Sequence, residues 1–408
     1  EDPLAARQRW IDAHRTHCFS LDKPLFHSAL LKAGNDDFIW YLNQHHLITD
    51  AWSVSIIYRK MSELYRAVAN GDDKPVGALP RYQDYVSQYR RGEDTPRRET
   101  ARAYWQQRLA EPPIPSTFYR KPPPDRGGRT ERIPIEFGTD RTQGIKALAD
   151  DKRFTAFTTD LALFQLFATI LFAYLYRITG NERLAIGVPS HGRPGAQAKA
   201  TAGLFIEVFP LLGEVNDDDT FLSLYQKLAQ HTQELLINAE PGVSDFEHSR
   251  AFDVVLNYIT AAFGDFSGMA MQSEWVHPDH GDRNHLLRLQ VHDFDQAGEL
   301  GLYVDLNTDA FVGEEKQRVA EHLLRLVDAL LAEPEKRIVD VPLVAGDSLR
   351  WLIETLNATP DEGPVIASVI DMFASQATAT PESVALVCRG RSVTYDELAR
   401  DVDRLSSW

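Results

Sequence analysis

Hydrophobic and polar residues alternate in several short stretches of this chain, as they do in half-buried β-strands. Every second residue is apolar in 287–291 and in 300–306, and a turn sequence at 295–298 separates the two stretches. A period of two places these side chains on one face, so the pattern predicts a β-hairpin. Stretches rich in branched and aromatic residues predict further strands at 36–44, 131–137, 184–188, 204–212 and 252–259.

Other stretches have the spacing of amphipathic helices. Ile57, Met61, Leu64 and Val68 recur at intervals of three or four, which places them on one helical face after a predicted N-cap at Ser53. Similar patterns predict helices at 82–109 with a break around 92–96, and at 142–149, 221–238 and 313–332.

The most apolar stretch, residues 161–176, has Gln165 and Thr169 as its polar interruptions. It is shorter than the roughly 20 residues that a membrane span needs, so we expect a helix buried on all sides. A residue of 158–160 is expected to cap it, and it should end near Gly180. Strands interspersed with helices indicate an α/β (α+β) fold in which mixed sheets pack against helices.

Proline and glycine mark the best internal boundary. Residues 111–128 contain six prolines and a Gly-Gly pair, which is typical of a linker or bridging loop. A length of 408 residues is expected to form two or three folding units at roughly 150 residues each. The sequence changes character again after Asp340, and residues 345–368 are interpreted as an interdomain connection.

Charge and cysteine content narrow the classes of function. The net charge of −16 argues against a general nucleic-acid-binding protein, which needs a basic face. Cys18 and Cys388 are too few and too distant for a disulfide framework, so a cytoplasmic location is expected. The chain opens at Glu1 without a signal peptide or a methionine, which suggests a piece of a longer polypeptide.

A histidine pair precedes an acidic residue at a predicted strand-to-helix turn, in His45-His46-Leu-Ile-Thr-Asp50. Neighbouring side chains of an extended backbone point to opposite faces, so one of the two histidines can face a given cavity, and the pair is a poor metal site. Imidazole can accept a proton from an amine or hydroxyl that attacks a thioester, and a helix N-terminus favours the developing oxyanion. The alternative is that both histidines fill space or cap the helix.

The segment from His45 to Ser53 resembles the HHxxxDG motif of condensation domains from nonribosomal peptide synthetases, which make secondary metabolites such as antibiotics. Other segments resemble further elements of that family, in family order from about residue 10 to 345. They are 19–26, 82–85, 184–193, 203–211 and 252–258.

The resemblance implies two lobes similar to chloramphenicol acetyltransferase, arranged as a V-shaped pseudo-dimer with the active site in a tunnel between them. An upstream donor and a downstream acceptor carrier protein would each deliver a phosphopantetheine thioester. The acceptor amine would attack the donor carbonyl and form an amide. No cofactor or metal bound by the domain itself is expected, and no nucleic acid or membrane partner.

By the same resemblance His46 is the catalytic residue at the centre of the tunnel. His45, Asp50, Ala51 and Arg193 are structural residues at the active site, and Arg193 is expected to form an ion pair with Asp50. Removing one member of a buried pair costs about 3–5 kcal/mol, so substitution of Asp50 is expected to damage folding and activity together.

Three departures from the family pattern stand out. Ala51 occupies the usual glycine position of the motif, and Glu207-Val208 replaces the usual Asn-Thr, which puts any role of that pair in doubt. The family's first motifs, which precede the segment at Phe19, are absent. We therefore expect an N-terminally incomplete lobe.

The end of the chain, residues 369–408, resembles the start of an adenylation domain, whose ATP-binding part is missing. The predicted organisation is an N-terminal lobe at 1–110, a Pro-rich linker at 111–130, a C-terminal lobe at 131–344, an interdomain linker at 345–368 and the adenylation start at 369–408. The adjoining adenylation domain is a further expected partner.

Other functions remain open from the sequence. A catalytically silent domain of this fold could recruit a tailoring enzyme, a starter domain could accept a fatty acyl donor, and a free-standing acyltransferase could use coenzyme A. A basic run could meet an acidic carrier protein or the phosphate of its arm, or could be a solvated helix face. It comprises Arg90, Arg91, Arg97, Arg98 and Arg102.

Overall fold

The computed structural model describes residues 3–72, 76–91, 95–111, 113–119, 123, 125–244, 251–260, 263–294, 298–344, 346–358 and 368–407. The chain forms two compact units, Glu1–Leu343 and Val344–Trp408.

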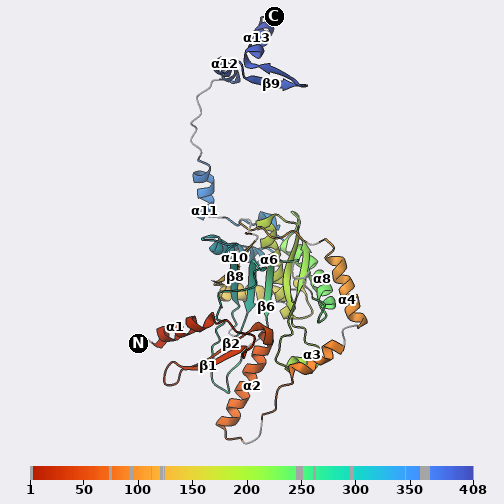
Figure 1. Ribbon diagram of the computed structural model, residues 1–408, viewed down its shortest axis with the longest axis vertical. Coiled ribbons are helices and arrows are strands. Elements are labelled where there is room, and N and C mark those ends of the chain that lie inside the picture. The colour runs from red at the N-terminus through yellow and green to blue at the C-terminus, as the bar shows by residue number, and fades with distance from the viewer. Residues whose placement is uncertain are drawn as a thin grey trace. The chain divides into compact units, whose positions relative to one another are not determined.

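The described residues of the first part of the larger unit form four helices, a short 3-10 turn and a β-hairpin (Figure 1). Their bounds are α1 (Pro3–Arg15), β1 (Phe26–Lys32), β2 (Phe38–Gln44), η1 (His46–Ile48), α2 (Ala51–Ala69), α3 (Tyr82–Arg91) and α4 (Pro96–Arg108). The predicted strand at 36–44 is present as β2, which pairs antiparallel with β1. The break predicted around 92–96 is also present, because Thr95 caps α4 and Pro96 stands in its first turn.

The described residues of the second part of this unit form a six-stranded sheet with helices. Its elements are β3 (Thr130–Ile135), α5 (Gly138–Ala149), η2 (Lys152–Phe154), α6 (Thr159–Thr179), β4 (Arg183–Ser190), α7 (Gly195–Ala200), β5 (Glu207–Glu214), α8 (Phe221–Asn238), β6 (Val254–Ile259), β7 (Leu287–His292), β8 (Gly301–Asn307), α10 (Glu315–Ala332) and η3 (Ile338–Asp340). The strand order is β3-β8-β7-β6-β4-β5. The β4–β6 and β6–β7 pairs are parallel and the other pairs are antiparallel, so the fold is mixed α/β as predicted.

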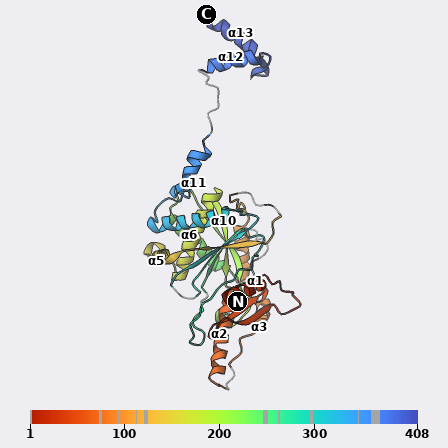
Figure 2. The same ribbon diagram turned by 90° about the vertical axis from the view of Figure 1, so that its left-hand side faces the viewer.

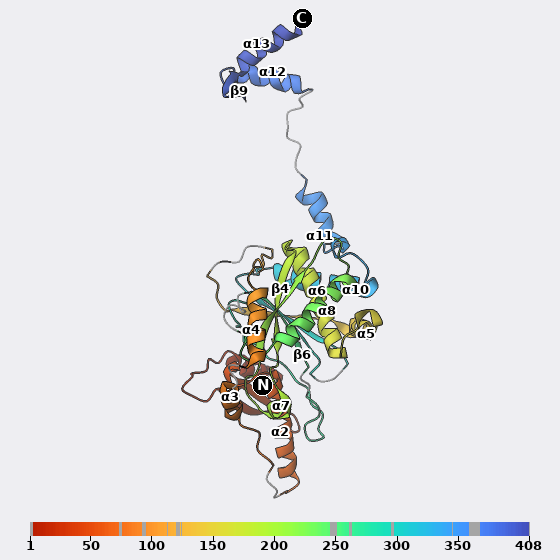
Figure 3. The ribbon, with the colours of Figure 1, turned by 90° about the vertical axis from the view of Figure 1, so that its right-hand side faces the viewer.

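Helix α6 is the centre of the core. All residues from Ala162 to Tyr176 are buried, which confirms the expected helix buried on all sides. Thr158 caps its start by accepting a hydrogen bond from the Leu161 N–H, and Gly180 ends it in a left-handed conformation. Helices α5, α6 and α10 lie on one side of the sheet (Figure 2), and α8 packs against both α4 and α6 (Figure 3).

Within the described residues, α6 is the one helix that is long and apolar enough to cross a membrane, judged by length and composition. Most of it, 83% of the most apolar window, is buried inside the protein. Such burial is typical of a core helix.

Several predicted boundaries shift in the structure. Helix α5 begins four residues earlier than predicted, and β5 begins at Glu207 rather than at residue 204. The β7–β8 hairpin is confirmed with Leu287 opposite Leu306, although part of its predicted turn, 295–297, lies outside the described residues.

The loop at residues 263–269 joins the sheet to α2 and β2. The Phe266 ring lies 5.7 Å from that of Tyr58 and 6.4 Å from that of Trp40, measured between centroids. The Ser267 N–H donates to the Ser62 Oγ at 2.8 Å. This loop therefore covers one side of α2.

Another side of α2 and of the β1–β2 hairpin stays uncovered. Met61, Leu64 and Val68, which share the predicted apolar face of α2, are 41%, 40% and 80% exposed. Phe26 and Leu30 of β1 are 55% and 70% exposed. The predicted face exists, but within the described residues no element buries these side chains.

The smaller unit contains α11 (Gly346–Arg350), η4 (Trp351–Leu356), α12 (Val369–Ala379), β9 (Val384–Cys388), β10 (Arg391–Thr394) and α13 (Tyr395–Ser406). Strands β9 and β10 form an antiparallel hairpin. Large apolar side chains, including Ile370, Val387 and Leu405, are 65–77% exposed.

Candidate functional site

The two histidines of the turn after β2 have different surroundings. The His45 Nδ1 accepts a hydrogen bond from the Leu47 N–H at 3.0 Å and so caps η1, and its ring packs edge-on near Phe19. The His46 side chain is exposed, and no hydrogen bond or ion pair to its ring occurs within the part of the chain that the structure describes. Of the two imidazoles, His46 is therefore the more exposed one, and His45 is the one with a structural contact.

Asp50 is the N-cap of α2. Its carboxylate accepts a hydrogen bond from the Ser53 N–H at 2.8 Å. The prediction that Ser53 is the N-cap is wrong, because the helix begins at Ala51 and the carboxylate of Asp50 reaches the free N–H of the third helical residue. Ser53 lies inside the first turn and is fully buried.

The Asp50 carboxylate also forms an ion pair with Arg193. One Nη of Arg193 lies 2.7 Å and 2.9 Å from the two oxygens, and both side chains are almost completely buried. The second Nη of Arg193 donates to the carbonyl oxygens of Ala198 and Thr201 at 2.8 Å and 2.6 Å. The structure thus contains the expected ion pair, and its charges are held by several further hydrogen bonds.

Ser53 connects this ion pair to the segment that begins at Gly203. The Ser53 hydroxyl donates to Asp50 or to the Gly203 carbonyl, with both oxygens within 2.8 Å, and it accepts the Gly203 N–H at 2.9 Å. The Phe205 N–H donates to the second Asp50 oxygen at 3.1 Å. Sequence reasoning assigned Ser53 to capping and missed this role. The sequence feature that could have indicated this role is the position of Ser53 three residues after Asp50, an acidic residue at the start of a predicted helix.

Aromatic side chains close the cluster. The Arg193 guanidinium lies 4.0 Å above the Phe205 ring, a cation–π contact, and Tyr82 and Tyr85 pack against the same ring. A Cβ at Gly203 would fall 2.1 Å from a Tyr82 ring carbon, so any side chain there would have to displace the Tyr82 ring. Four segments that were singled out in the sequence, 45–53, 82–85, 184–193 and 203–211, therefore meet at one place.

Burial affects the titration of two residues beside the turn. It lowers the pKa of Arg193 below its ordinary value, and the neighbouring Asp50 charge opposes this effect. The pKa of His191 is lowered by burial, and also by the positive charges of Lys199 and Arg193. The His191 ring lies 6.0 Å from that of Trp52, so a second imidazole, which sequence reasoning did not select, stands near the start of α2.

Ala51 is compatible with the turn. It is the first residue of α2, and the described non-glycine residues with positive φ are Ser267, Asp279 and Arg389. A residue in ordinary helical conformation does not need glycine. The departure from glycine at this position therefore leaves the backbone unstrained.

Glu207 has a clear structural contact. Its carboxylate accepts hydrogen bonds from the Gly242 N–H at 2.5 Å and from the Ser244 hydroxyl at 2.6 Å. These bonds tie the start of β5 to the loop after α8. The carboxylate at this position thus anchors a loop.

The basic run does not form one exposed face among the residues whose side chains the structure describes. Arg98 is buried, and Arg97 forms an ion pair with Glu240, while the side chains of Arg90 and Arg91 lie outside the description. The described residues also contain no group of three or more His, Cys, Asp or Glu side chains arranged to hold a metal ion.

Comparison with known proteins places these observations in a family. The condensation-domain family model matches residues 2–351. A linear gramicidin synthase protein of Brevibacillus parabrevis is 25% identical over all of this chain, which spans 5% of that protein. Enniatin synthase of Fusarium equiseti is 26% identical over 93% of the chain, which spans 12% of it. The chain thus covers a small fraction of these relatives.

Solved structures show a similar fold. The first condensation domain of the calcium-dependent antibiotic synthetase aligns with a TM-score of 0.70 and 23% identity, over 85% of this chain and 76% of that one. The starter condensation domain of rhizomide synthetase aligns with a TM-score of 0.69 and 22% identity, over 84% and 78% of the two chains.

Proposed function

The chain belongs to the condensation-domain family, and from this premise we propose that it joins two carrier-bound thioesters through an amide bond. The donor is an acyl or peptidyl thioester and the acceptor is an aminoacyl thioester, each on the phosphopantetheine arm of a carrier protein. The carrier upstream supplies the donor and the carrier downstream supplies the acceptor. The observation that carries this proposal is the exposed His46 ring close to the buried Asp50–Arg193 ion pair at the start of α2.

In the proposed reaction the acceptor amine nitrogen attacks the donor carbonyl carbon. The new C–N bond forms, the C–S bond breaks and the donor arm leaves as a thiol, which takes up the proton that the amine loses. His46 is the residue that accepts this proton or positions the attacking amine, since an imidazole changes protonation near neutral pH. Holding the two tethered reactants in the right orientation supplies a large part of the rate acceleration over the reaction in free solution.

His45, Asp50, Ala51 and Arg193 support His46 without touching the substrate in this proposal. His45 caps η1 and thereby fixes the backbone on which His46 stands. The Asp50–Arg193 pair fixes the start of α2, and Ala51 begins that helix. The positive end of the α2 dipole lies close to the turn and favours negative charge on the attacked carbonyl oxygen.

We also propose that further polypeptide completes both units. A lone two-stranded hairpin is marginally stable, so the exposed apolar faces of β1 and α2 support an additional N-terminal segment that covers them. In the smaller unit, the exposed Ile370, Val387 and Leu405 support a start of an adenylation domain whose remaining part would bury them.

The function is tested in the full-length protein with both carriers loaded, by mass spectrometry of the acceptor-bound product. Replacing His46 with alanine is expected to reduce product formation by a factor of about 10² or more, the usual contribution of a positioned acid–base group. His280→Ala is the matched control, because this histidine is also exposed but lies before β7, away from the turn. Unchanged turnover in His46→Ala would remove His46 from the mechanism, and no product from the wild type would favour a domain without catalytic activity.

A further inference from the structure

A ladder of polar side chains crosses the face of the six-stranded sheet that is turned away from α6. Alternate residues of β7 from Leu287 to Val291 pack in the main core, so Gln290 points to the other face. Asp305 of β8 and Asn257 of β6 alternate with core residues of their own strands in the same way. The three polar side chains therefore lie on one face of the sheet, on neighbouring strands.

Hydrogen bonds run along this ladder in one direction. The Nε and one Nη of Arg132, on β3, donate to the two Asp305 oxygens at 2.7 Å and 2.9 Å. The Gln290 amide nitrogen donates to Asp305 at 2.5 Å. The Asn257 amide nitrogen donates to the Gln290 side-chain oxygen at 2.9 Å. A carboxylate paired with a guanidinium accepts hydrogen bonds and donates none, so it fixes which end of the Gln290 amide faces it, and Gln290 in turn fixes Asn257.

This orientation leaves the Asn257 side-chain oxygen as the free end of the ladder. No described residue donates a hydrogen bond to this oxygen, and the half-buried side chain keeps it accessible. An amide oxygen can accept a hydrogen bond but cannot donate one. A ligand that satisfies it must therefore offer an N–H or an O–H.

Asn257 lies near the end of the sheet that carries the histidine turn. Strands β4 and β6 are parallel, so both end on the same side. Past the end of β4, Arg193 binds Asp50 at the start of α2. Past the end of β6, the Phe263 ring packs on Tyr58 in the first half of the same helix. Both strand ends therefore meet α2 at the end of the sheet where the N-terminal elements lie (Figures 1 and 3), and ligands of open α/β sheets bind outside such carboxyl ends.

Aromatic rings connect the ladder face of the sheet with α2. The Phe263 ring, which packs on Tyr58, lies 5.6 Å from that of Phe294, and Phe294 stacks on His292 at 4.1 Å. The His292 ring lies 5.0 Å from that of Tyr303. His292 and Tyr303 each stand two positions from a ladder residue of their own strand, so they share its face. The ladder face is thus the one turned toward α2.

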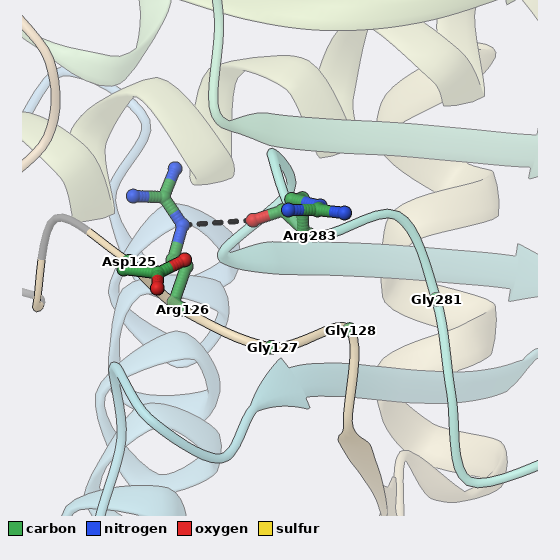
Figure 4. A pocket seen from close by; sticks show the side chains of 6 residues that line it. All are labelled: Asp125, Arg126, Gly127, Gly128, Gly281 and Arg283. Carbon is green, nitrogen blue, oxygen red and sulfur yellow. Dashed lines mark hydrogen bonds between the residues drawn. The ribbon is translucent and has the colours of Figure 1, made fainter.

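The other end of the sheet has a different surface. There the loops before β3 and β7 border a pocket of about 500 Å³ with Arg126 and Arg283 in its lining (Figure 4). The Asp309 carboxylate accepts the Gly127 N–H at 2.8 Å, so charges of both signs lie at this pocket. The exposed Asn284 stands on the loop before β7, away from the histidine turn, and offers a control position.

A nucleophile between His46 and Asn257 would face two hydrogen-bond acceptors. A neutral primary amine uses its lone pair on the thioester carbon and has two N–H bonds, one for each acceptor. A hydroxyl has a single O–H and an N-methylated amine has a single N–H, so each of them leaves one acceptor without a donor. Sites that are built to bond a substrate N–H or O–H reject analogues that lack it, because a polar group of the site then stays unpaired.

We propose that Asn257 makes the domain selective for acceptors with a primary amine over hydroxyl and N-methylated acceptors. The inference rests on the proposed function and names its acceptor class. With an amine the C–N bond forms, the C–S bond breaks, one proton passes to the leaving thiol and the second N–H stays bonded to Asn257. With a hydroxyl the C–O bond would form and the same thiol would leave, but the one proton would go with it. Asn257 is thus the specificity-determining contact, and Gln290 is a positioning residue.

The test compares three acceptors on the downstream carrier of the full-length protein. They are the amino acid that gives product in the His46 experiment, its N-methyl derivative and the corresponding 2-hydroxy acid. Mass spectrometry of the acceptor-bound product gives kcat/KM for each, and the wild type is expected to favour the primary amine. Asn257→Ala is expected to reduce both preferences about tenfold, mainly by slowing the reaction of the primary amine. Because each variant is compared with the wild type on the same acceptors, the lower reactivity of a hydroxyl cancels.

Two further variants separate positioning from structure. Gln290→Met keeps the length of the side chain but cannot hold the Asn257 amide, so both preferences are expected to fall about threefold. A merely structural defect would instead slow all three acceptors equally. Asn284→Ala is the matched control and is expected to keep both preferences.

Three results would overturn the proposal. The wild type could use the three acceptors equally, Asn257→Ala could keep both preferences, or the variant could gain on the N-methyl acceptor alone, which relief of crowding would explain. Should Asn257→Ala fail to fold, Gln290→Met decides the question by the same ratios. A wild type that forms no product from any loaded pair contradicts the proposed function itself, and the His46 experiment shows this before the acceptors are compared.

Discussion

The ion pair between Asp50 and Arg193 allows the most direct test of how the turn is held. Asn at position 50 keeps an N-cap side chain for α2 but removes the charge, so Asp50→Asn isolates the ion pair from the cap. Arg193 then remains buried with its charge uncompensated, because its other partners, which are carbonyl oxygens, the Ser53 hydroxyl and the Phe205 ring, carry no charge. Leaving a buried charge alone costs about 3–5 kcal/mol of unfolding free energy.

Asp50→Ala removes the cap as well and is expected to cost about 1 kcal/mol more. The assay is urea unfolding at neutral pH, followed by tryptophan fluorescence. A double-mutant cycle with Arg193→Met measures the coupling between the two side chains, since both single variants leave one partner buried alone. The reasoning fails if Asp50→Asn unfolds within about 1 kcal/mol of the wild type, or if the cycle gives no coupling.

Two further substitutions test other parts of the larger unit. Burial and nearby arginines lower the pKa of His322 to about 4, below the value of 6.5 expected for an unfolded chain. Between pH 4 and pH 6.5 the unfolded state therefore binds more protons at this residue than the folded state does. The contribution of His322 to the free energy of unfolding is complete above pH 6.5, and roughly 2–3 kcal/mol of it is lost as the pH approaches 4. His322→Gln is expected to lose less stability over this interval, as measured by urea unfolding at neutral pH and near pH 4.5; equal losses in both proteins would assign the effect to other groups. Gly203→Ala places a Cβ against the Tyr82 ring, and it is expected to lower the free energy of unfolding by about 1–3 kcal/mol and to lower amide formation. Gly213→Ala is the control, because its Cβ meets Phe172 and Leu228 in the core. This variant is expected to lose stability without a specific loss of activity per folded molecule.

The elements that were predicted well are those whose ends are specified locally. Helix α8 was predicted with both ends correct, since Thr220 and Ser223 form a capping box and an apolar face follows. The end of α6 at Gly180 was found in the same way. Such signals lie within a few residues of the structure that they specify.

The features that sequence patterns alone did not predict depend on contacts between distant segments. Sequence spacing placed β5 too early, because residues 203–206 bind Asp50, Ser53 and Tyr82 and do not join the sheet. The ion pair of Asp50 with Arg193 spans 143 residues and was expected from family resemblance, since no periodicity indicates it.

The long separation within the Asp50 cluster also has a consequence during synthesis. Ribosomes release a chain from its N-terminus, so Asp50 and Ser53 emerge well before Arg193 and Gly203 are translated. Until then the carboxylate is hydrated and the turn at His46 lacks the contacts that fix it. Contacts of such high contact order form slowly, and a nascent chain that stalls before Arg193 would present an unanchored histidine turn to proteases and chaperones.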